Sequence, residues 1–339
     1  MKQRATMTQL IGNTPLIYLR EASEQTGCDI YGKAEFLNPG GSIKDRTALG
    51  IIQAAEKSGE LTPGGVIVEG TAGNTGIGLT ILANAMGYQS VVVMPESQSA
   101  EKIERLDILG AELILTADYD YSSPNHYIHQ AEQIANSRKK TETHGAIWAR
   151  QFDNPANREI HASTTGPEIW DQTEGTVDAF ICAVGTGGTL AGVAEALRER
   201  NPAVKIGIAD PAGSALYNYF SNGELTRSSG RSITEGIGVS FLPGNLAGTK
   251  LDFSYRIEDE DALPLLFALL LNEGLLLGGS AAINVAGAVE MAKEMGPGHT
   301  IVTVLCDGGD RYRSKLFNPN FLYKNKLPVP DSTIGRLVS

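Results

Sequence analysis

Short runs of apolar, often β-branched residues alternate along the chain with longer segments in which apolar positions recur at helical spacing. Several of the short runs show almost no polar alternation, which is typical of parallel strands covered by helices on both faces. Strands are therefore predicted at 31–36, 66–68, 91–93, 113–115, 179–184, 206–208 and 301–305.

Amphipathic helices are predicted in several of the intervals between these strands. One begins near Lys44 and ends at Gly59, a second runs from about Asn74 to Gly87, and a third ends at Gly110. A glycine just after the last apolar position is a common helix C-cap. The repetition of strand, helix and strand predicts an α/β fold with right-handed crossovers.

Two segments do not fit this alternation. The polar stretch 135–144 is interpreted as a connection between two α/β units. The segment after Phe317 carries Asn-Pro-Asn and two further prolines, which favours an irregular tail on the surface.

Composition narrows the class of protein. Of 339 residues, 42% are apolar and 20% are charged, which suits a globular chain long enough for two modest domains. A formal net charge of −11 argues against a general nucleic-acid surface, which needs a basic face. The apolar run 262–271 is too short to span a bilayer, and residues 1–10 lack the apolar core of a signal peptide.

The cysteines indicate the compartment. Cys28, Cys182 and Cys306 lie far apart in the sequence, and none belongs to a CxxC pair or a Cys/His cluster. We therefore expect no metal site and no disulfide framework, and we expect the chain in a reducing cytoplasm.

The first of three informative loops, residues 38–46, reads Asn-Pro-Gly-Gly-Ser-Ile-Lys-Asp-Arg. Ser42 is the predicted N-cap of the helix that follows, and Lys44 lies at its start. The helix dipole disfavours a cation there, so such a position favours the neutral amine that an imine requires. Taken alone, however, a lysine is more often a solvated side chain, here beside Asp45.

The other two loops are predicted anion sites. Residues 70–78 contain Thr-Ala-Gly-Asn-Thr-Gly, whose backbone N–H groups and threonine hydroxyls suit a carboxylate. This loop lacks the lysine of a P-loop. Residues 185–189 read Gly-Thr-Gly-Gly-Thr between a strand and a helix, which predicts a phosphate cradle at the helix N-terminus.

A nicotinamide dinucleotide site is an alternative interpretation of the third loop. Gly185 and Gly187 fit the start of the dinucleotide fingerprint, and Asp210 ends the next strand at a suitable distance for a ribose contact. Leu190 stands where the third glycine is required, so this match is weak.

Together these segments resemble the cysteine synthase and cystathionine β-synthase family of pyridoxal-phosphate enzymes. The resemblance runs from Ile-Gly-Asn-Thr-Pro-Leu at 11–16 to about Phe317, and it includes Gly-Gly-Ser-Ala-Ala at 278–282. No single motif is specific, but their order and spacing are. By this resemblance Lys44 is the lysine that carries the cofactor.

The resemblance implies a set of site residues. Lys44 would form the internal aldimine with pyridoxal 5′-phosphate and later act as the base at the substrate Cα. Asn74 would bond the ring hydroxyl of the cofactor, and Ser280 would face its pyridine nitrogen. The implied phosphate ligands are Gly185, Thr186, Gly187, Gly188 and Thr189. The implied substrate-binding residues are Thr71, Ala72, Gly73, Asn74, Thr75, Gln151 and Gly236.

The resemblance also implies a reaction. A serine at the ring nitrogen makes the cofactor a weaker electron sink than an acid would, which favours proton removal coupled to loss of the β-substituent. The expected transferase activity is a β-replacement. O-acetyl-L-serine would lose acetate to give an aminoacrylate, sulfide would add to Cβ, and L-cysteine would leave.

The family fold implies two three-layer α/β/α domains with mostly parallel sheets, like the tryptophan synthase β-subunit. The larger, cofactor-binding domain would combine residues 1–46 and 150–317. The smaller, mobile domain would be 47–149, and 318–339 would form a C-terminal tail. Closure of the smaller domain would exclude water from the reaction. A homodimer is a further expectation.

Two positions depart from the family pattern. Ala72 replaces the usual serine and removes a hydroxyl near the reacting end of the substrate, which bears on the choice of leaving group or thiol. Residues 306–312 read Cys-Asp-Gly-Gly-Asp-Arg-Tyr in place of a proline-serine version. Because Cys306 ends an apolar strand, it is interpreted as a buried structural thiol.

Three alternatives within or near the family stay open. Cystathionine β-synthase, which joins serine and homocysteine, is slightly favoured by residues 278–280, but we see no haem-binding or regulatory extension. An eliminating dehydratase usually carries histidine where Thr75 stands. A binding partner of the serine acetyltransferase C-terminal tail is a non-enzymic alternative, against which the intact Lys44 and phosphate loop favour catalysis.

Overall fold

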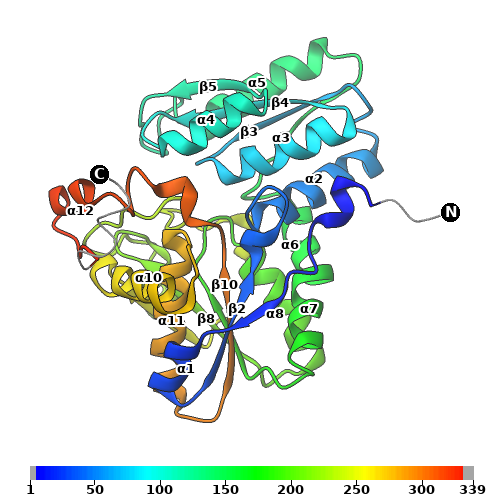
Figure 1. Cartoon of the computed structure of the whole chain (residues 1–339). Helices are drawn as coiled ribbons and strands as arrows, with labels where there is room; N and C mark the ends of the chain where they lie inside the picture. The colour runs from blue at the N-terminus through cyan, green and yellow to red at the C-terminus, as the bar shows by residue number, and fades with distance from the viewer. Residues whose placement is uncertain (1–4, 331–339) are drawn as a thin grey trace.

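Two β-sheets organise the computed structural model, which describes residues 5–330 (Figure 1). The larger sheet has the order β1-β2-β10-β7-β8-β9, and only its β1–β2 pair is antiparallel. Its strands are β1 (Leu16–Tyr18), β2 (Asp29–Ala34), β7 (Ala179–Cys182), β8 (Lys205–Pro211), β9 (Phe253–Ile257) and β10 (Thr300–Leu305).

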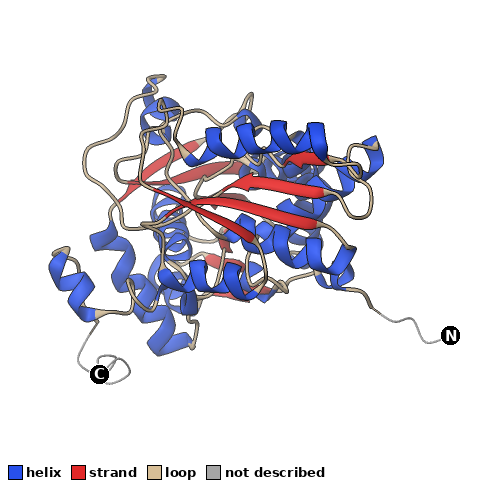
Figure 2. Cartoon of the chain, turned by 90° about the horizontal axis from the view of Figure 1, so that it is seen from above, coloured by secondary structure: helices blue, strands red, loops and turns tan. Residues whose placement is uncertain are grey.

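The smaller sheet is entirely parallel, with the order β5-β4-β3-β6. Its strands are β3 (Val66–Gly70), β4 (Gln89–Pro95), β5 (Glu112–Thr116) and β6 (Ala146–Trp148). Helices cover both faces of this sheet (Figure 2). They are α2 (Lys44–Ser58), α3 (Asn74–Met86), α4 (Ala100–Ile108) and α5 (Tyr127–Thr141).

The remaining helices accompany the larger sheet. They are α1 (Arg20–Thr26), α6 (Pro155–Ile160), α7 (Gly166–Gln172), α8 (Gly188–Arg200), α9 (Leu216–Asn222), α10 (Asp259–Glu273), α11 (Gly279–Met295) and α12 (Pro319–Lys324). Short helical turns lie at η1 (Met7–Leu10), η2 (Glu35–Leu37), η4 (Gly244–Leu246) and η5 (Gly309–Tyr312), and a π-helical turn at η3 (His161–Thr165). The mixed architecture of mostly parallel sheets agrees with the predicted α/β class.

The apolar runs form strands because both of their faces are buried. In β3, Val66 and Val68 pack with Ala131 of α5, whereas Ile67 packs on the opposite face with Ile52 of α2. Burying a side chain of this size contributes about 1.5–3 kcal/mol. A strand covered on both sides therefore has no place for polar alternation, which explains the continuous apolar sequence.

The structure corrects three sequence-based expectations about elements. The polar stretch 135–144 is not a connection, because it contains the C-terminal half of α5, which packs on the sheet through Ala131 and Ala135. Residues after Phe317 are not simply irregular, because Asn318 caps α12 by accepting from the Asn320 backbone N–H at 3.0 Å.

The third correction concerns Ser42. The residue before α2 is Ile43, so Ser42 lies one position earlier than a conventional N-cap, although its Oγ accepts from the Lys44 backbone N–H at 3.2 Å. The last part of the predicted tail, 331–339, and residues 1–4 lie outside the described residues. Among the helices described, none combines the length and apolar character needed to cross a membrane.

Candidate active site

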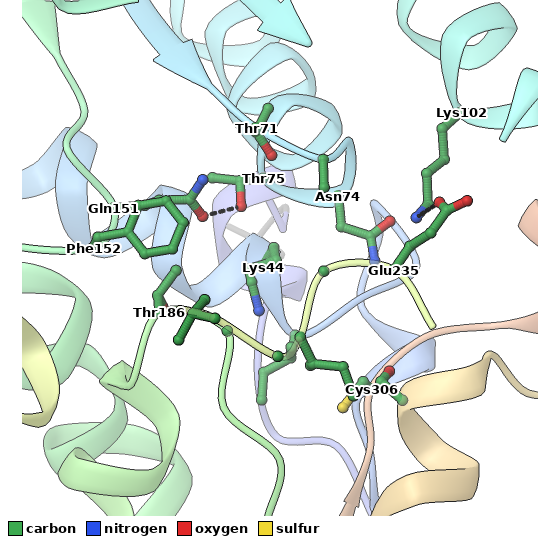
Figure 3. Close-up of a pocket in the computed structure, with 18 of the residues that line it drawn as sticks. Lys44, Thr71, Asn74, Thr75, Lys102, Gln151, Phe152, Thr186, Glu235 and Cys306 are labelled. Atoms are coloured by element: carbon green, nitrogen blue, oxygen red, sulfur yellow. Dashed lines mark hydrogen bonds and ion pairs between the residues drawn. The ribbon is translucent and has the colours of Figure 1, made fainter. Parts of the chain in front are cut away.

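Loops from both sheets meet around one cavity of about 200 Å³ (Figure 3). Several of these loops follow the carboxyl ends of parallel strands, which is where open α/β sheets bind ligands. Lys44 begins α2, Asn74 begins α3, and Gly185 follows β7, so three predicted motifs converge on this cavity. A smaller cavity of about 30 Å³ adjoins it and shares Lys44.

Lys44 is held in place by pairing of its loop with the end of β10. The Ile43 N–H donates to the Cys306 carbonyl oxygen at 3.0 Å, and Ser42 forms an isolated bridge with Asp307. Within the loop, the Gly40 N–H donates to Asp45 Oδ2 at 2.5 Å, and burial raises the pKa of the Asp45 carboxyl to about 7. The lysine amine thus projects into the cavity from a fixed backbone (Figure 3).

The loop between β3 and α3 forms a polar pocket wall. Thr75 Oγ1 donates to Gln151 Oε1 at 2.6 Å, and Gln151 Nε2 donates to the Gly70 carbonyl oxygen at 3.2 Å. Thr71, Ala72 and Asn74 also line the cavity. These hydroxyls and amides, together with the N-terminus of α3, suit a carboxylate.

Gly73 plays a different part in this loop. It has a φ of +124°, and an added Cβ would lie 2.7 Å from Lys102 Cδ, so the position requires glycine. Its N–H donates to Thr71 Oγ1 at 3.1 Å, and the residue lines neither cavity. Gly73 therefore shapes the loop around the cavity.

The Gly185–Thr189 segment surrounds the smaller cavity at the N-terminus of α8. Gly187 has a φ of +83°, and a Cβ on Gly185 would lie 2.2 Å from the Gly236 carbonyl oxygen. Gly185, Thr186, Gly187 and Thr189 line this cavity, whereas Gly188 packs against Asn157 and lines neither cavity.

This loop fits the phosphate group that the sequence predicts. The first N–H groups of α8 lack helical partners, and the dipole of the helix attracts an anion. Thr186 Oγ1 accepts from Asn157 Nδ2 at 2.9 Å, which leaves the threonine O–H available as a donor. The donor set matches a phosphate, so the residues fit pyridoxal phosphate.

His161 supports the phosphate loop and was not found by sequence reasoning. Its Nε2 lies 3.2 Å from Thr189 Oγ1 and its Nδ1 lies 2.8 Å from Thr165 Oγ1. Burial lowers the pKa of this imidazole well below its usual range, so the ring is neutral. No motif marks a histidine in a π-helical turn, and only the fold brings it to α8.

Ser280 and Cys306 line the main cavity on the side of the larger sheet. Ser280 is buried at the start of α11. Cys306 lines both cavities, a position that its interpretation as a buried structural thiol does not include. Burial raises the pKa of the Cys306 thiol to about 11, and Asn284 Nδ2 donates to its sulfur at 3.3 Å. The thiol is therefore neutral at ordinary pH.

Lys102 and Glu235 are further cavity residues that the sequence analysis did not select. Lys102 Nζ lies 2.7 Å from Glu235 Oε2, and Lys315 Nζ lies 2.6 Å from Glu235 Oε1. Burial alone would raise the pKa of the Glu235 carboxyl, but the two lysines lower it. A lysine in an ordinary helix gives no sequence signal for burial; here the pairing permits it.

Asp210 does not support the dinucleotide alternative. Its carboxylate is fully buried, and its Oδ2 accepts from the Tyr217 backbone N–H at 2.7 Å at the start of α9. Burial raises the pKa of this carboxyl to about 6. The residue lines neither of the two cavities that contain the predicted phosphate loop.

The fold and the site define the class of α/β enzymes that bind pyridoxal phosphate, and comparisons with known proteins agree with this class. Residues 7–307 match the family model described as Pyridoxal-phosphate dependent enzyme. Cysteine synthase 1 of Neurospora crassa is 49% identical over 325 residues, covering 95% of this chain and 85% of the relative. The chain therefore belongs to the cysteine synthase family of pyridoxal-phosphate-dependent enzymes.

Two solved structures show the same fold. The O-acetylserine dependent cystathionine beta-synthase from Helicobacter pylori is 32% identical, with a TM-score of 0.81 and coverage of 93% of this chain and 99% of that one. A hydrogen sulfide-producing enzyme from Fusobacterium nucleatum is 34% identical, with a TM-score of 0.80 and coverage of 91% and 100%. Both likenesses extend over the two sheets.

Proposed function

We propose that the protein makes L-cysteine from O-acetyl-L-serine and sulfide by β-replacement. The observation that carries this proposal is the position of Lys44, which lines both cavities. The larger cavity is lined by the β3–α3 loop, which suits a carboxylate, and the smaller one by the phosphate loop, Gly185–Thr189. A cofactor held by its phosphate and a substrate held by its carboxylate would then meet at one amine. Relatives that are cysteine synthases or O-acetylserine-dependent synthases support the same reaction.

Pyridoxal phosphate, when bound, supplies an electron sink that stabilises negative charge at the substrate Cα. Lys44 would hold this group and move the proton at Cα. Thr71, Thr75 and Gln151 would bind the substrate carboxylate, and Gly185–Thr189 would hold the phosphate. Asn74 and Ser280 would contact the ring, at its oxygen and its nitrogen. These roles are carried over from the family and, apart from that of Gly188, are supported by the lining of the two adjoining cavities.

The neutral Cys306 thiol suits this site. A thiolate beside Lys44 would compete with sulfide as a nucleophile, but burial keeps the proton on the sulfur. With serine rather than an acid near the ring nitrogen, departure of acetate would be coupled to proton removal. The residues present thus favour replacement at Cβ.

We further propose that residues 47–149 form a smaller mobile domain that closes on a larger one formed by 1–46 and 150–317. The β3–α3 loop comes from the first and the phosphate loop from the second, so closure would bring the substrate-binding loop and the cofactor-binding loop together. Closure would also exclude water from the reacting carbon. The ion pair between Lys102 and Glu235 joins the same two segments.

Cystathionine formation from serine and homocysteine is the second candidate. The Helicobacter pylori neighbour is described as a cystathionine β-synthase that depends on O-acetylserine, so one site of this shape serves a larger thiol. Ala72 lines the cavity without a hydroxyl, which removes one group able to bind the hydroxyl of serine. This favours the acetylated substrate for the present chain.

The substrates of an enzyme of this family are small molecules. A homodimer, a complex with the C-terminal tail of serine acetyltransferase and a cytoplasmic location complete the proposal. The three cysteines are all free, which suits a reducing compartment. Sedimentation would test the dimer, and titration with the tail peptide would test the complex.

A substrate matrix tests the proposed reaction. The purified protein is incubated with O-acetyl-L-serine or L-serine, each combined with sulfide or homocysteine, and products are identified by mass spectrometry. Cysteine formed fastest from O-acetyl-L-serine and sulfide supports the proposal. Cystathionine formed faster than cysteine with either donor would move the assignment to the second candidate. Peptide binding without turnover of any pair would contradict the enzyme assignment.

A further inference from the structure

Asn74 lies between two charged groups from the segment that follows β10. Its Nδ2 donates to Asp307 Oδ2 at 2.6 Å, and its Oδ1 accepts from Arg311 Nη1 at 2.5 Å. Asp307 is fully buried and Arg311 is 4% exposed. Neither lines the cavities, so both can act on a bound group only through Asn74.

These contacts dictate which way the Asn74 amide faces. A guanidinium only donates hydrogen bonds and a carboxylate only accepts them. The reverse orientation would place the amide NH₂ against the guanidinium and the amide oxygen against the carboxylate, which is unfavourable at both ends. One Nδ2–H remains uncommitted on a residue that lines the cavity.

The two charged residues are anchored independently of Asn74. Tyr312 Oη donates to Asp307 Oδ2 at 2.6 Å, and Arg311 Nη2 donates to the Gly40 carbonyl oxygen. The backbone of Asp307 accepts from the Gly278 N–H at 3.0 Å. Because these anchors fix both partners, the amide has little freedom to turn.

We propose that Asp307 and Arg311 are positioning residues that hold the Asn74 N–H toward the ring oxygen of bound pyridoxal phosphate. This inference rests on the proposed cofactor contact of Asn74. An N–H donor favours the deprotonated ring oxygen, whereas a turned amide would present its carbonyl oxygen and favour the protonated form. The pair thereby controls the protonation of the cofactor without touching it.

The test removes both charges but leaves a polar side chain at each position, Asn of the same size at 307 and the shorter Gln at 311. Asp307→Asn and Arg311→Gln can each donate or accept, so the double variant allows either orientation of Asn74. Asp310→Asn with Arg313→Gln is the matched control, because both residues lie in the same segment and are exposed. The readout is the ratio of the absorption bands that report protonated and deprotonated ring oxygen.

We expect this ratio to rise about fivefold in the double variant, on the scale of one hydrogen bond, and to stay at the wild-type value in the control. An unchanged ratio in a double variant that binds the cofactor overturns the inference while leaving the proposed function intact. If the double variant holds no cofactor, the single variants decide: an intermediate rise supports the inference and no rise overturns it. A wild-type protein without any cofactor band overturns the proposed function, and the inference with it.

Discussion

At the scale of single residues, the proposed carboxylate site in the β3–α3 loop depends on one hydrogen bond. Thr75 Oγ1 donates to Gln151 Oε1 at 2.6 Å and so joins two segments that are distant in sequence. Thr75→Ala removes this contact, which orients the Gln151 amide at the wall of the cavity. We expect the KM for O-acetyl-L-serine to rise about tenfold with a smaller change in kcat, on the scale of a hydrogen bond to a charged group. Thr75→Ser, which keeps the hydroxyl, should stay within about threefold of wild type. Equal KM values for the two variants in initial-rate measurements would contradict the assigned role.

Glu69 gives a prediction of pH dependence. It is buried behind Gln151, and burial raises the pKa of its carboxyl from 4.5 to about 8. Between these values the folded protein holds a proton that the unfolded chain has lost, so the free energy of unfolding falls as pH rises, by at most about 1.4 kcal/mol per pH unit. Glu69→Gln, which cannot titrate, should flatten this decline in urea unfolding between pH 5 and pH 8. A decline as steep as that of wild type would show that another group is responsible.

At the scale of elements, the phosphate loop is fitted closely against the loop that contains Gly236. A Cβ on Gly185 would approach the Gly236 carbonyl oxygen to 2.2 Å, closer than any real contact allows. Gly185→Ala should therefore displace the loop and weaken cofactor binding by about tenfold or more, since overpacking of this kind costs about 1–3 kcal/mol. Fluorescence titration with pyridoxal phosphate measures the change. Wild-type affinity in the variant would mean that the loop does not hold the phosphate.

The elements that the sequence predicts best are those whose pattern comes from burial alone. The two-sided burial of β3 and the glycine at the end of α2 both leave local signals. By contrast, α5 presents only a narrow apolar face, so its polar half resembles a loop. The short strands β1, β6 and β9 carry too few apolar positions to stand out, and their pairing depends on the rest of the sheet.

The residues of the site also divide into those that local sequence predicts and those that it does not. The motif residues around Lys44, Asn74 and Gly185 lie at one cavity because they begin helices or loops at the ends of parallel strands. Lys102 and His161 could not be predicted, since each is placed by a partner distant in sequence. Cys306 was located correctly at the end of a strand, but the sequence does not show that this strand ends at the cavity.

At the scale of the whole molecule, ion pairs cross between the helices of the smaller sheet and the segments of the larger one. Glu235 pairs with Lys102 of α4, which is 1% exposed. Glu235→Gln leaves that lysine buried with a neutral partner, so we expect a loss of stability of a few kcal/mol and faster hydrogen exchange in α4. Glu112→Gln, which breaks the exposed pair with Arg138, is the matched control and should cost less than about 1 kcal/mol. Similar losses for the two variants would show that the buried pair does not hold the two parts together.

The central claim is that Lys44 carries pyridoxal phosphate at a site where an acyl-serine loses its β-substituent. The most direct test is the visible absorption spectrum of the purified protein, recorded before and after O-acetyl-L-serine and then sulfide are added. We predict a cofactor band that shifts to longer wavelength with O-acetyl-L-serine and returns with sulfide as cysteine appears, and we predict that Lys44→Ala lacks both the band and the shift. A protein without a cofactor band after reconstitution, or a Lys44→Ala variant with the wild-type response, would contradict the account.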